Sequence, residues 1–224
     1  MRLGIDLEPL ADLASLWKHF SLDLLDFAYA AASAGAEMLM APEAKIERTE
    51  IALLARPGLP LFVLKVRQGE FTRTMQLAPP ADRFFVIADH GGALKETDDF
   101  AKFGKETMDP TTLGACVEAE LGAIKNVARA GMSWIVFSSD SYAQASTPKE
   151  AEDELARLST AAFAAQKFGL RIAVMGAMPP HLLKPLSDIE GIEELYPGPE
   201  IWLRALRVGW DRALAEYRAA MGRP

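Results

Sequence analysis

Cysteine and histidine are both scarce in this sequence. Cys116 is the only cysteine among the 224 residues, and there are three histidines. A single thiol excludes an internal disulfide and a zinc site made of several cysteines. Because Cys116 lies in an apolar, strand-like segment, we expect it to be a small buried hydrophobic residue.

Long apolar runs and a net positive charge are also missing. No stretch approaches the length of a membrane span, and Met1–Asp6 does not resemble the start of a signal peptide, so we expect a cytoplasmic protein. The 24 basic residues are outnumbered by 31 acidic ones, which gives a net charge of −7. This balance disfavours nucleic acids and anionic membranes as partners and leaves a small-molecule metabolite.

The chain does contain a regular alternation of strand-like and helix-like segments. Eight strand candidates occur, each followed by a helix or a loop, which predicts one domain over residues 1–224 with the fold of a (β/α)8 TIM-type barrel. An open doubly wound sheet would favour a glycine-rich loop after the first strand, and Asp6-Leu7-Glu8-Pro9 is unlike one. The predicted strands are Arg2–Leu7, Glu37–Ala41, Leu59–Val66, Arg83–Ala88, Thr111–Val117, Gly131–Phe137, Arg171–Ala177 and Ile192–Tyr196.

Capping residues predict two of the helices. Thr147-Pro148-Lys149-Glu150 combines a capping threonine, proline at the first helical position and glutamate at the third, and predicts a helix that continues to Phe168. Ser21 is expected to cap an earlier helix that ends before Gly35.

Apolar spacing predicts one further helix, and its absence elsewhere predicts a loop. A final helix is expected from near Pro199 to Met221, with Leu203 and Leu206 on its buried face. The stretch Gly91–Pro110 has glycines, charges and little apolar periodicity, which predicts a long loop with at most a short helix.

Motifs in both halves of the chain resemble those of one known family. They are Ile5-Asp6, Asp23, Ala34-Gly35-Ala36, Tyr142-Ala143-Gln144-Ala145, Glu154-Leu155-Ala156-Arg157, Ala161-Ala162-Phe163-Ala164-Ala165, Gly169-Leu170, Glu194-Leu195, Gly198 and Arg204-Ala205. With these motifs the chain resembles the pyridoxine 5′-phosphate synthases over nearly its whole length, with a shortening around the fourth helix. The resemblance implies an eight-stranded barrel and a homo-oligomer, typically an octamer. It also implies condensation of 1-deoxyxylulose 5-phosphate with 3-amino-1-hydroxyacetone phosphate, without a metal or an organic cofactor.

The residues that perform that reaction in the family are mostly replaced. The resemblance places the following residues where the family has asparagine, histidine, glutamate or glycine: Gly4, Leu7, Pro42, Lys65, Val136, Ser138, Met175-Gly176-Ala177, Pro199 and Leu203. Imidazole is the group best suited to proton transfer near neutral pH, so the parent reaction is not expected. Of the basic cluster after the second strand, Arg48 remains. The loss of small residues around Gly198 weakens a phosphate site there.

Lys65 is the strongest catalytic candidate. By the period-two alternation of a strand, Val63, Lys65 and Arg67 share one face. If that face points into the barrel, burial would lower the pKa of Lys65 and make it a Schiff-base nucleophile, with Asp6, Glu8 and Asp89 as acid or base. The alternative is an ion pair of Lys65 with Asp6 or Asp89 that only holds the mouth of the barrel together.

Further polar residues near the expected mouth are candidates for binding the substrate: Glu8, Arg48, Arg67, His90, Ser138, Asp140, Gly198 and Arg204. His90 could also share a metal with Asp6, Glu120 or Asp140. Carboxylates at strand ends are common, however, so we expect a solvated loop histidine and no metal.

These observations lead to two main hypotheses and one minor one. The first is a divergent enzyme that performs condensation or lyase-type chemistry on a small carbonyl or phosphorylated metabolite. The second is a non-catalytic descendant that binds a ligand or a partner. The third is pyridoxine 5′-phosphate synthesis retained with substitute residues.

Overall fold

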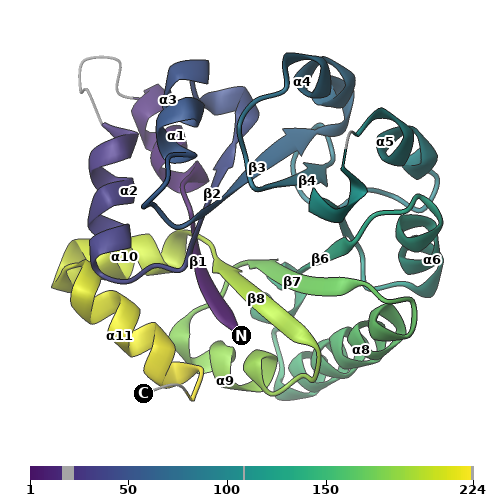
Figure 1. The fold of residues 1–224 in the computed structure, drawn as a ribbon. Helices are drawn as coiled ribbons and strands as arrows, with labels where there is room; N and C mark the ends of the chain where they lie inside the picture. Colours follow the sequence, from purple (N-terminus) through teal and green to yellow (C-terminus); the bar gives the residue numbers. More distant parts are fainter. Residues whose placement is uncertain (17–22, 108, 223–224) are drawn as a thin grey trace.

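Eight parallel strands form a closed barrel in this computed structural model, which describes residues 1–16, 23–107 and 109–222. The strands follow one another around the barrel in chain order, and β8 pairs with β1 (Figure 1). The expected (β/α)8 barrel is therefore confirmed. The strands are β1 (Arg2–Asp6), β2 (Met38–Pro42), β3 (Leu61–Arg67), β4 (Arg83–Ile87), β5 (Leu113–Val117), β6 (Trp134–Ser138), β7 (Arg171–Gly176) and β8 (Ile192–Pro197).

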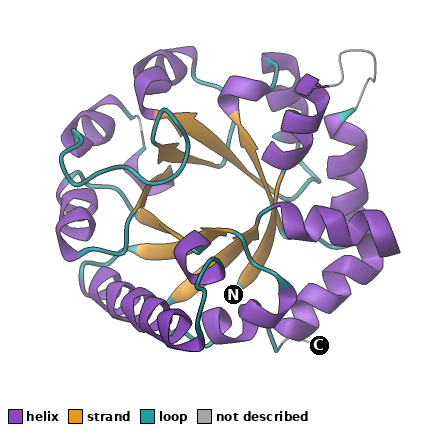
Figure 2. Cartoon of the chain, turned by 180° about the vertical axis from the view of Figure 1, so that it is seen from behind, coloured by secondary structure: helices purple, strands orange, loops and turns teal. Residues whose placement is uncertain are grey.

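Helices form a layer around the barrel, as the view from behind in Figure 2 also shows. The α-helices are α1 (Glu8–Leu16), α2 (Leu24–Ser33), α3 (Arg48–Leu54), α4 (Phe71–Leu77), α5 (Phe100–Glu106), α6 (Leu121–Arg129), α7 (Asp140–Ala143), α8 (Pro148–Lys167), α9 (Pro180–Ser187), α10 (Pro199–Val208) and α11 (Trp210–Ala220). The described residues also form three short 3-10 helices, η1 (Glu43–Lys45), η2 (Gln68–Glu70) and η3 (Pro110–Thr112). Within the described ranges, no helix is long and apolar enough to cross a membrane.

The expected cap of α8 is confirmed, because the Thr147 side chain accepts a hydrogen bond from the Glu150 amide. The residue that caps α2 is Asp23, whose carboxylate accepts from the Leu25 amide at 2.8 Å. Ser21, the cap expected from the sequence, lies outside the described residues.

The expected single helix at the end of the chain is wrong. Gly209 has a φ of 82°, a left-handed backbone conformation that favours glycine, and it separates α10 from α11. The predicted buried face of α10 is wrong as well. Leu203 and Leu206 are 61% and 70% exposed, while the buried side chains of this helix include Ile201 and Trp202.

The region predicted as a long loop contains the seven-residue helix α5, the helix that follows β4. Phe100 and Phe103 of α5 are buried, and Phe103 lies edge-on to Phe71 of α4 with ring centroids 5.0 Å apart. These two buried aromatic side chains therefore hold the short helix α5 in place. The apolar periodicity of the sequence alone was too weak to predict it.

Apolar side chains fill the inside of the barrel. They come from seven strands: Met38, Met40, Val63, Phe85, Ile87, Cys116, Trp134, Val136, Ala173 and Tyr196. The eighth strand, β1, contributes Gly4, where a Cβ atom would overlap the ring of Tyr196. Glycine at this position thus lets a large aromatic ring occupy the barrel interior.

The amino-terminal end of the barrel holds a buried ionic network that sequence analysis missed. Glu194 is fully buried and pairs with Arg2 and Arg83. Tyr196 donates a hydrogen bond to the same carboxylate, and the Arg83 guanidinium lies 4.0 Å from the ring centroid of Trp134. This network is at the opposite end from Lys65 and has a structural role, because function in these barrels resides at the carboxyl-terminal end.

Candidate active site

Lys65 points into the barrel, as the alternation along β3 predicts. Its neighbour on the same face, Val63, belongs to the apolar interior, and Lys65 itself is only 4% exposed. Lys65 pairs with Pro42 of β2 near the carboxyl end of β3. The amine therefore lies at the end of the barrel where such folds carry their active sites.

Two carboxylates from the end of β1 meet this amine. The Lys65 Nζ donates to Asp6 Oδ2 at 2.6 Å and also to Glu8 Oε2. The second oxygen of Asp6 accepts from the Glu8 amide at 3.0 Å, and Trp202 donates its indole N–H to the Asp6 carbonyl. Asp6 is thus fixed by both its backbone and its side chain.

A second lysine extends the group, and sequence analysis did not find it. Lys45, in η1 after β2, donates to Glu8 Oε1 at 2.7 Å and to Asp12 of α1 at 2.5 Å. Asp6, Glu8, Asp12, Lys45 and Lys65 together form the Lys65 cluster. The available signal was a lysine four residues after a predicted strand end, and such lysines are common on protein surfaces.

The expected lowering of the Lys65 pKa is wrong. Burial lowers the pKa of the amine, but the charges of Asp6 and Glu8 and their hydrogen bonds raise it by more. The side chain is therefore an ammonium ion at neutral pH. An ammonium ion has no free electron pair, so Lys65 is not a nucleophile in this arrangement.

The two carboxylates that share Lys65 have pKa values displaced in opposite directions. Burial raises the pKa of Asp6, although Lys65 opposes the shift. Burial also tends to raise the pKa of Glu8, but Lys65 and Lys45 lower it to about 2. Asp6 is consequently the more basic carboxylate, and Glu8 remains an anion. Paired groups with separated pKa values are typical of acid–base sites.

The other proposed acid–base group, Asp89, does not join the cluster. Its carboxylate accepts a hydrogen bond from the Gly69 amide at 2.8 Å, and both Asp89 and His90 are exposed. Asp89 and His90 are exposed because they lie in the loop after β4. No group of three or more His, Cys, Asp or Glu side chains suited to a metal occurs among the described residues.

The loops after β6 and β7 hold each other. Asp140 accepts a hydrogen bond from the Ala177 amide at 2.8 Å and from the Ser138 hydroxyl at 3.0 Å. The hydroxyl of Ser139 reaches the Ala177 carbonyl, and the Gly198 amide donates to the Gly176 carbonyl at 2.8 Å. Ser138, Asp140 and Gly198 therefore connect neighbouring loops.

Among the described residues, none of the three proposed arginines forms a hydrogen bond or ion pair with Lys65, Asp6 or Glu8. Arg204 joins α10 to Glu216 of α11, and Arg48 of α3 donates to the Leu77 carbonyl of α4. Arg67, at the end of β3, lines a groove together with Arg48. Helix–helix contacts thus account for two guanidinium groups that the sequence offered for substrate binding.

Cys116 is buried in the barrel interior, as expected. Burial raises the pKa of its thiol to about 12, so the thiol is neutral at physiological pH. A neutral thiol is a poor nucleophile. The polar chemistry of the barrel interior at this end therefore rests on Lys65 and its carboxylates.

Comparison with known proteins identifies the family. The model of the family described as "Pyridoxal phosphate biosynthesis protein PdxJ" matches residues 88–223, more than half of the chain. The chain belongs to the PdxJ family. The matched region begins directly after β4. The Lys65 cluster therefore lies in the part of the chain before the matched region.

Curated relatives agree with this assignment. A pyridoxine 5′-phosphate synthase of Prochlorococcus marinus (strain MIT 9211) is 33% identical over 180 residues, which cover 80% of this chain and 67% of the relative. One from Synechococcus sp. (strain JA-2-3B'a(2-13)) is 34% identical over 114 residues, 51% of this chain and 43% of the relative. The match with the second relative thus spans less than half of its length.

A solved structure with the same fold is 3-hexulose-6-phosphate synthase from Salmonella typhimurium. It aligns with a TM-score of 0.63 over 99% of this chain and 100% of that chain, at 14% sequence identity. At this identity the similarity shows the barrel fold alone, and the chemistry must be argued from the site.

Proposed function

We propose that this PdxJ family member is an enzyme that acts on a small carbonyl or phosphorylated metabolite at the carboxyl-terminal mouth of its barrel. The observation that carries the proposal is the convergence of Asp6 and Glu8 on the buried ammonium of Lys65. The family assignment supports an origin in small-molecule biosynthesis.

The cluster suits removal of a proton from a carbon next to a carbonyl group. Asp6 accepts the proton, the C–H electron pair becomes the carbon–carbon double bond of an enolate, and the carbonyl oxygen takes the negative charge. The Lys65 ammonium stabilises that oxygen as the charge develops. Glu8, with its lowered pKa, keeps Lys65 protonated. An enolate is the nucleophile of aldol-type condensations, and its formation is reversed in the corresponding cleavage.

The parent mechanism is not part of the proposal. At positions where the resemblance assigns functional residues to the family, this chain has Gly4 and Val136. Val136 packs in the apolar interior, and the space beside Gly4 is taken by Tyr196. A direct assay for pyridoxine 5′-phosphate tests the remaining possibility of retained synthesis.

Proton exchange tests the proposed enzyme. The protein is incubated in D2O with dihydroxyacetone phosphate, pyruvate and related small carbonyl compounds, and deuterium incorporation next to the carbonyl is followed by NMR. We expect exchange by the wild-type protein and a loss of about 100-fold or more for Asp6→Asn, the size typical of a general base. The matched control, Asp140→Asn, should exchange normally. Absence of exchange across the panel would reject this reaction class.

One observation favours a second candidate, a non-catalytic protein that binds a ligand or partner. Lys65 is held by two carboxylates and is almost completely buried, so its charge is already neutralised. In that case a carbonyl or phosphorylated compound would bind without proton exchange. The homo-oligomeric state, the cytoplasmic location and the absence of a cofactor also remain proposals for this chain.

A further inference from the structure

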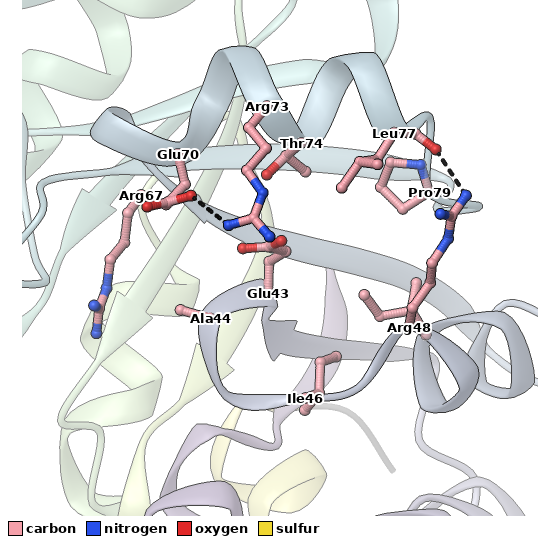
Figure 3. A pocket seen from close by; sticks show the side chains of 11 residues that line it. Glu43, Ala44, Ile46, Arg48, Arg67, Glu70, Arg73, Thr74, Leu77 and Pro79 are labelled. Carbon is pink, nitrogen blue, oxygen red and sulfur yellow. Dashed lines mark hydrogen bonds and ion pairs between the residues drawn. The ribbon is translucent and has the colours of Figure 1, made fainter.

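A second polar site lies in a groove between α3 and α4 (Figure 3). The groove has a volume of about 480 Å³. Its walls come from η1, α3, the end of β3 and α4, and it shares no residue with the Lys65 cluster.

Thr74 places an unsatisfied hydroxyl at this groove. The residue is 1% exposed, and its Oγ1 has no hydrogen-bond partner among the described residues. Thr160 shows the usual arrangement for a helical threonine, because its hydroxyl donates to the Ala156 carbonyl one turn earlier at 2.9 Å. A buried hydroxyl without a partner is unfavourable, and a ligand in the groove would supply the missing hydrogen bond.

Charges of both signs lie beside Thr74. Figure 3 shows Glu43, Glu70 and Arg73 directed into the same end of the groove. Arg73 and Glu70 form an exposed pair with an N–O distance of 3.3 Å, an interaction that a ligand can replace at small energetic loss. Within the described ranges, neither Arg67 nor Glu43 has a hydrogen-bonded or ion-paired partner. The groove can therefore accept an anionic and a cationic group together.

The opposite end of the groove is apolar. Ile51 of α3 lines the groove together with Leu77 and Pro79, and Arg48 closes this end through its hydrogen bond to the Leu77 carbonyl. The turn that brings Pro79 into place depends on Ala78, which has a φ of 43°, a left-handed conformation that is uncommon for a residue with a side chain. A short hydrocarbon chain fits against this wall.

We propose that the groove binds a free α-amino acid with an aliphatic or aromatic side chain. The carboxylate pairs with Arg67 and Arg73, the ammonium group pairs with Glu43, and the side chain packs on Leu77 and its apolar neighbours. The Thr74 hydroxyl completes the polar end. A free amino acid thus offers partners to the Glu43 carboxylate, the Arg67 guanidinium and the Thr74 hydroxyl. Its side chain also covers the apolar end of the groove.

Calorimetric titration of the full chain with leucine and phenylalanine tests this site. We expect saturable binding that weakens by about 10-fold or more in Arg73→Gln, since a charge-assisted hydrogen bond is lost. Thr74→Val should weaken binding by roughly 2- to 10-fold, the range for one hydrogen bond. The same variant should unfold at an equal or higher temperature, because it removes an unsatisfied buried hydroxyl.

Leucine analogues and matched variants make the test specific. 4-Methylpentanoate lacks the ammonium group and 3-methylbutylamine lacks the carboxylate, so both should bind more weakly than leucine. Thr160→Val and Arg212→Gln, on α8 and α11, should bind leucine like the wild type. The proposal is overturned if neither amino acid binds, if Arg73→Gln and Thr74→Val bind normally, or if inorganic phosphate or 4-methylpentanoate binds as tightly as leucine. Since no residue is shared, this titration and the proton-exchange assay fail independently.

Discussion

The mouth of the barrel has two sectors that use polar residues differently. In the sector of β1, β2 and β3, charged side chains meet at a buried ammonium, with Lys65 held by Asp6 and Glu8. In the sector of β6, β7 and β8, short polar side chains and backbone groups connect one loop to the next, as Asp140 does with the Ala177 amide. Charge is concentrated in the first sector, and the second is largely neutral.

The two sectors also differ in their relation to the family. The family model matches residues 88–223, which include β6 to β8 but not β1 to β3. The sector of β6, β7 and β8, whose loops hydrogen-bond to one another, therefore lies within the region that matches the family model. Burying a charge costs free energy unless the charge is paired. Buried charged groups are often found at functional sites, so we expect the function in the sector of β1, β2 and β3.

Among the variants that test this difference, Lys65→Met should have the largest effect on stability. It leaves Asp6 as a buried carboxylate without its cation, which should cost about 3–5 kcal/mol of unfolding free energy. Denaturant unfolding measures the loss. The double variant with Asp6→Asn should recover part of it, whereas the exposed-pair control Lys149→Met should stay near wild type. Equal stability of Lys65→Met and the wild type would show that the cluster is not a buried ionic group.

Glu8→Gln should have the next largest effect, and the effect depends on pH. Loss of its hydrogen bonds to Lys65 and Lys45 should cost roughly 1–2 kcal/mol near neutral pH, limited by partial exposure. Because folding lowers the Glu8 pKa from 4.5 to about 2, the wild-type advantage is complete above pH 4.5 and is lost as the pH falls toward 2. Unfolding curves over this range give the difference directly. A difference that grows in acid would contradict the shift.

Asp140→Ala tests the neutral sector. It removes the acceptor for the Ala177 amide and the Ser138 hydroxyl, with an expected cost of about 1 kcal/mol, because the side chain is exposed and water replaces part of the contact. Hydrogen exchange of the Ala177 amide should become faster. If proton exchange on carbonyl substrates fell together with stability, the loops of β6 and β7 would belong to the active site.

Arg204→Gln should have the smallest effect. Arg204 pairs with Glu216 between α10 and α11, where solvent screens both side chains, so we expect only a small loss of stability. Thermal unfolding measures this change, and the proton-exchange activity should be unaltered. A clear loss of activity in a protein of normal stability would return Arg204 to the substrate-binding residues.

Local patterns in the sequence predicted most of the fold. Strand boundaries agreed with the structure within a few residues, since buried parallel strands are short apolar runs between turns. The proline–glutamate cap of α8 was equally clear. The break at Gly209 was missed because the apolar spacing continues across it, and only the backbone angle shows that the helix ends.

The candidate site was predicted in part. Strand alternation correctly placed Lys65 inside the barrel, and Asp6 and Glu8 were recognised at the end of the first strand. Lys45 was missed because it lies in a short 3-10 helix that has no periodic pattern. Thr74 gave no signal, since a threonine in a helix normally hydrogen-bonds to its own backbone.

The sequence by itself determined the order of strands and helices and the inward face of β3, because these depend on neighbouring residues and on the two periodicities of the backbone. The tertiary structure alone decided which charges meet. Lys65 lies 59 positions from Asp6, and only closure of the barrel brings the two side chains together. That contact reversed the expected direction of the Lys65 pKa, since the proximity of two carboxylates outweighs burial.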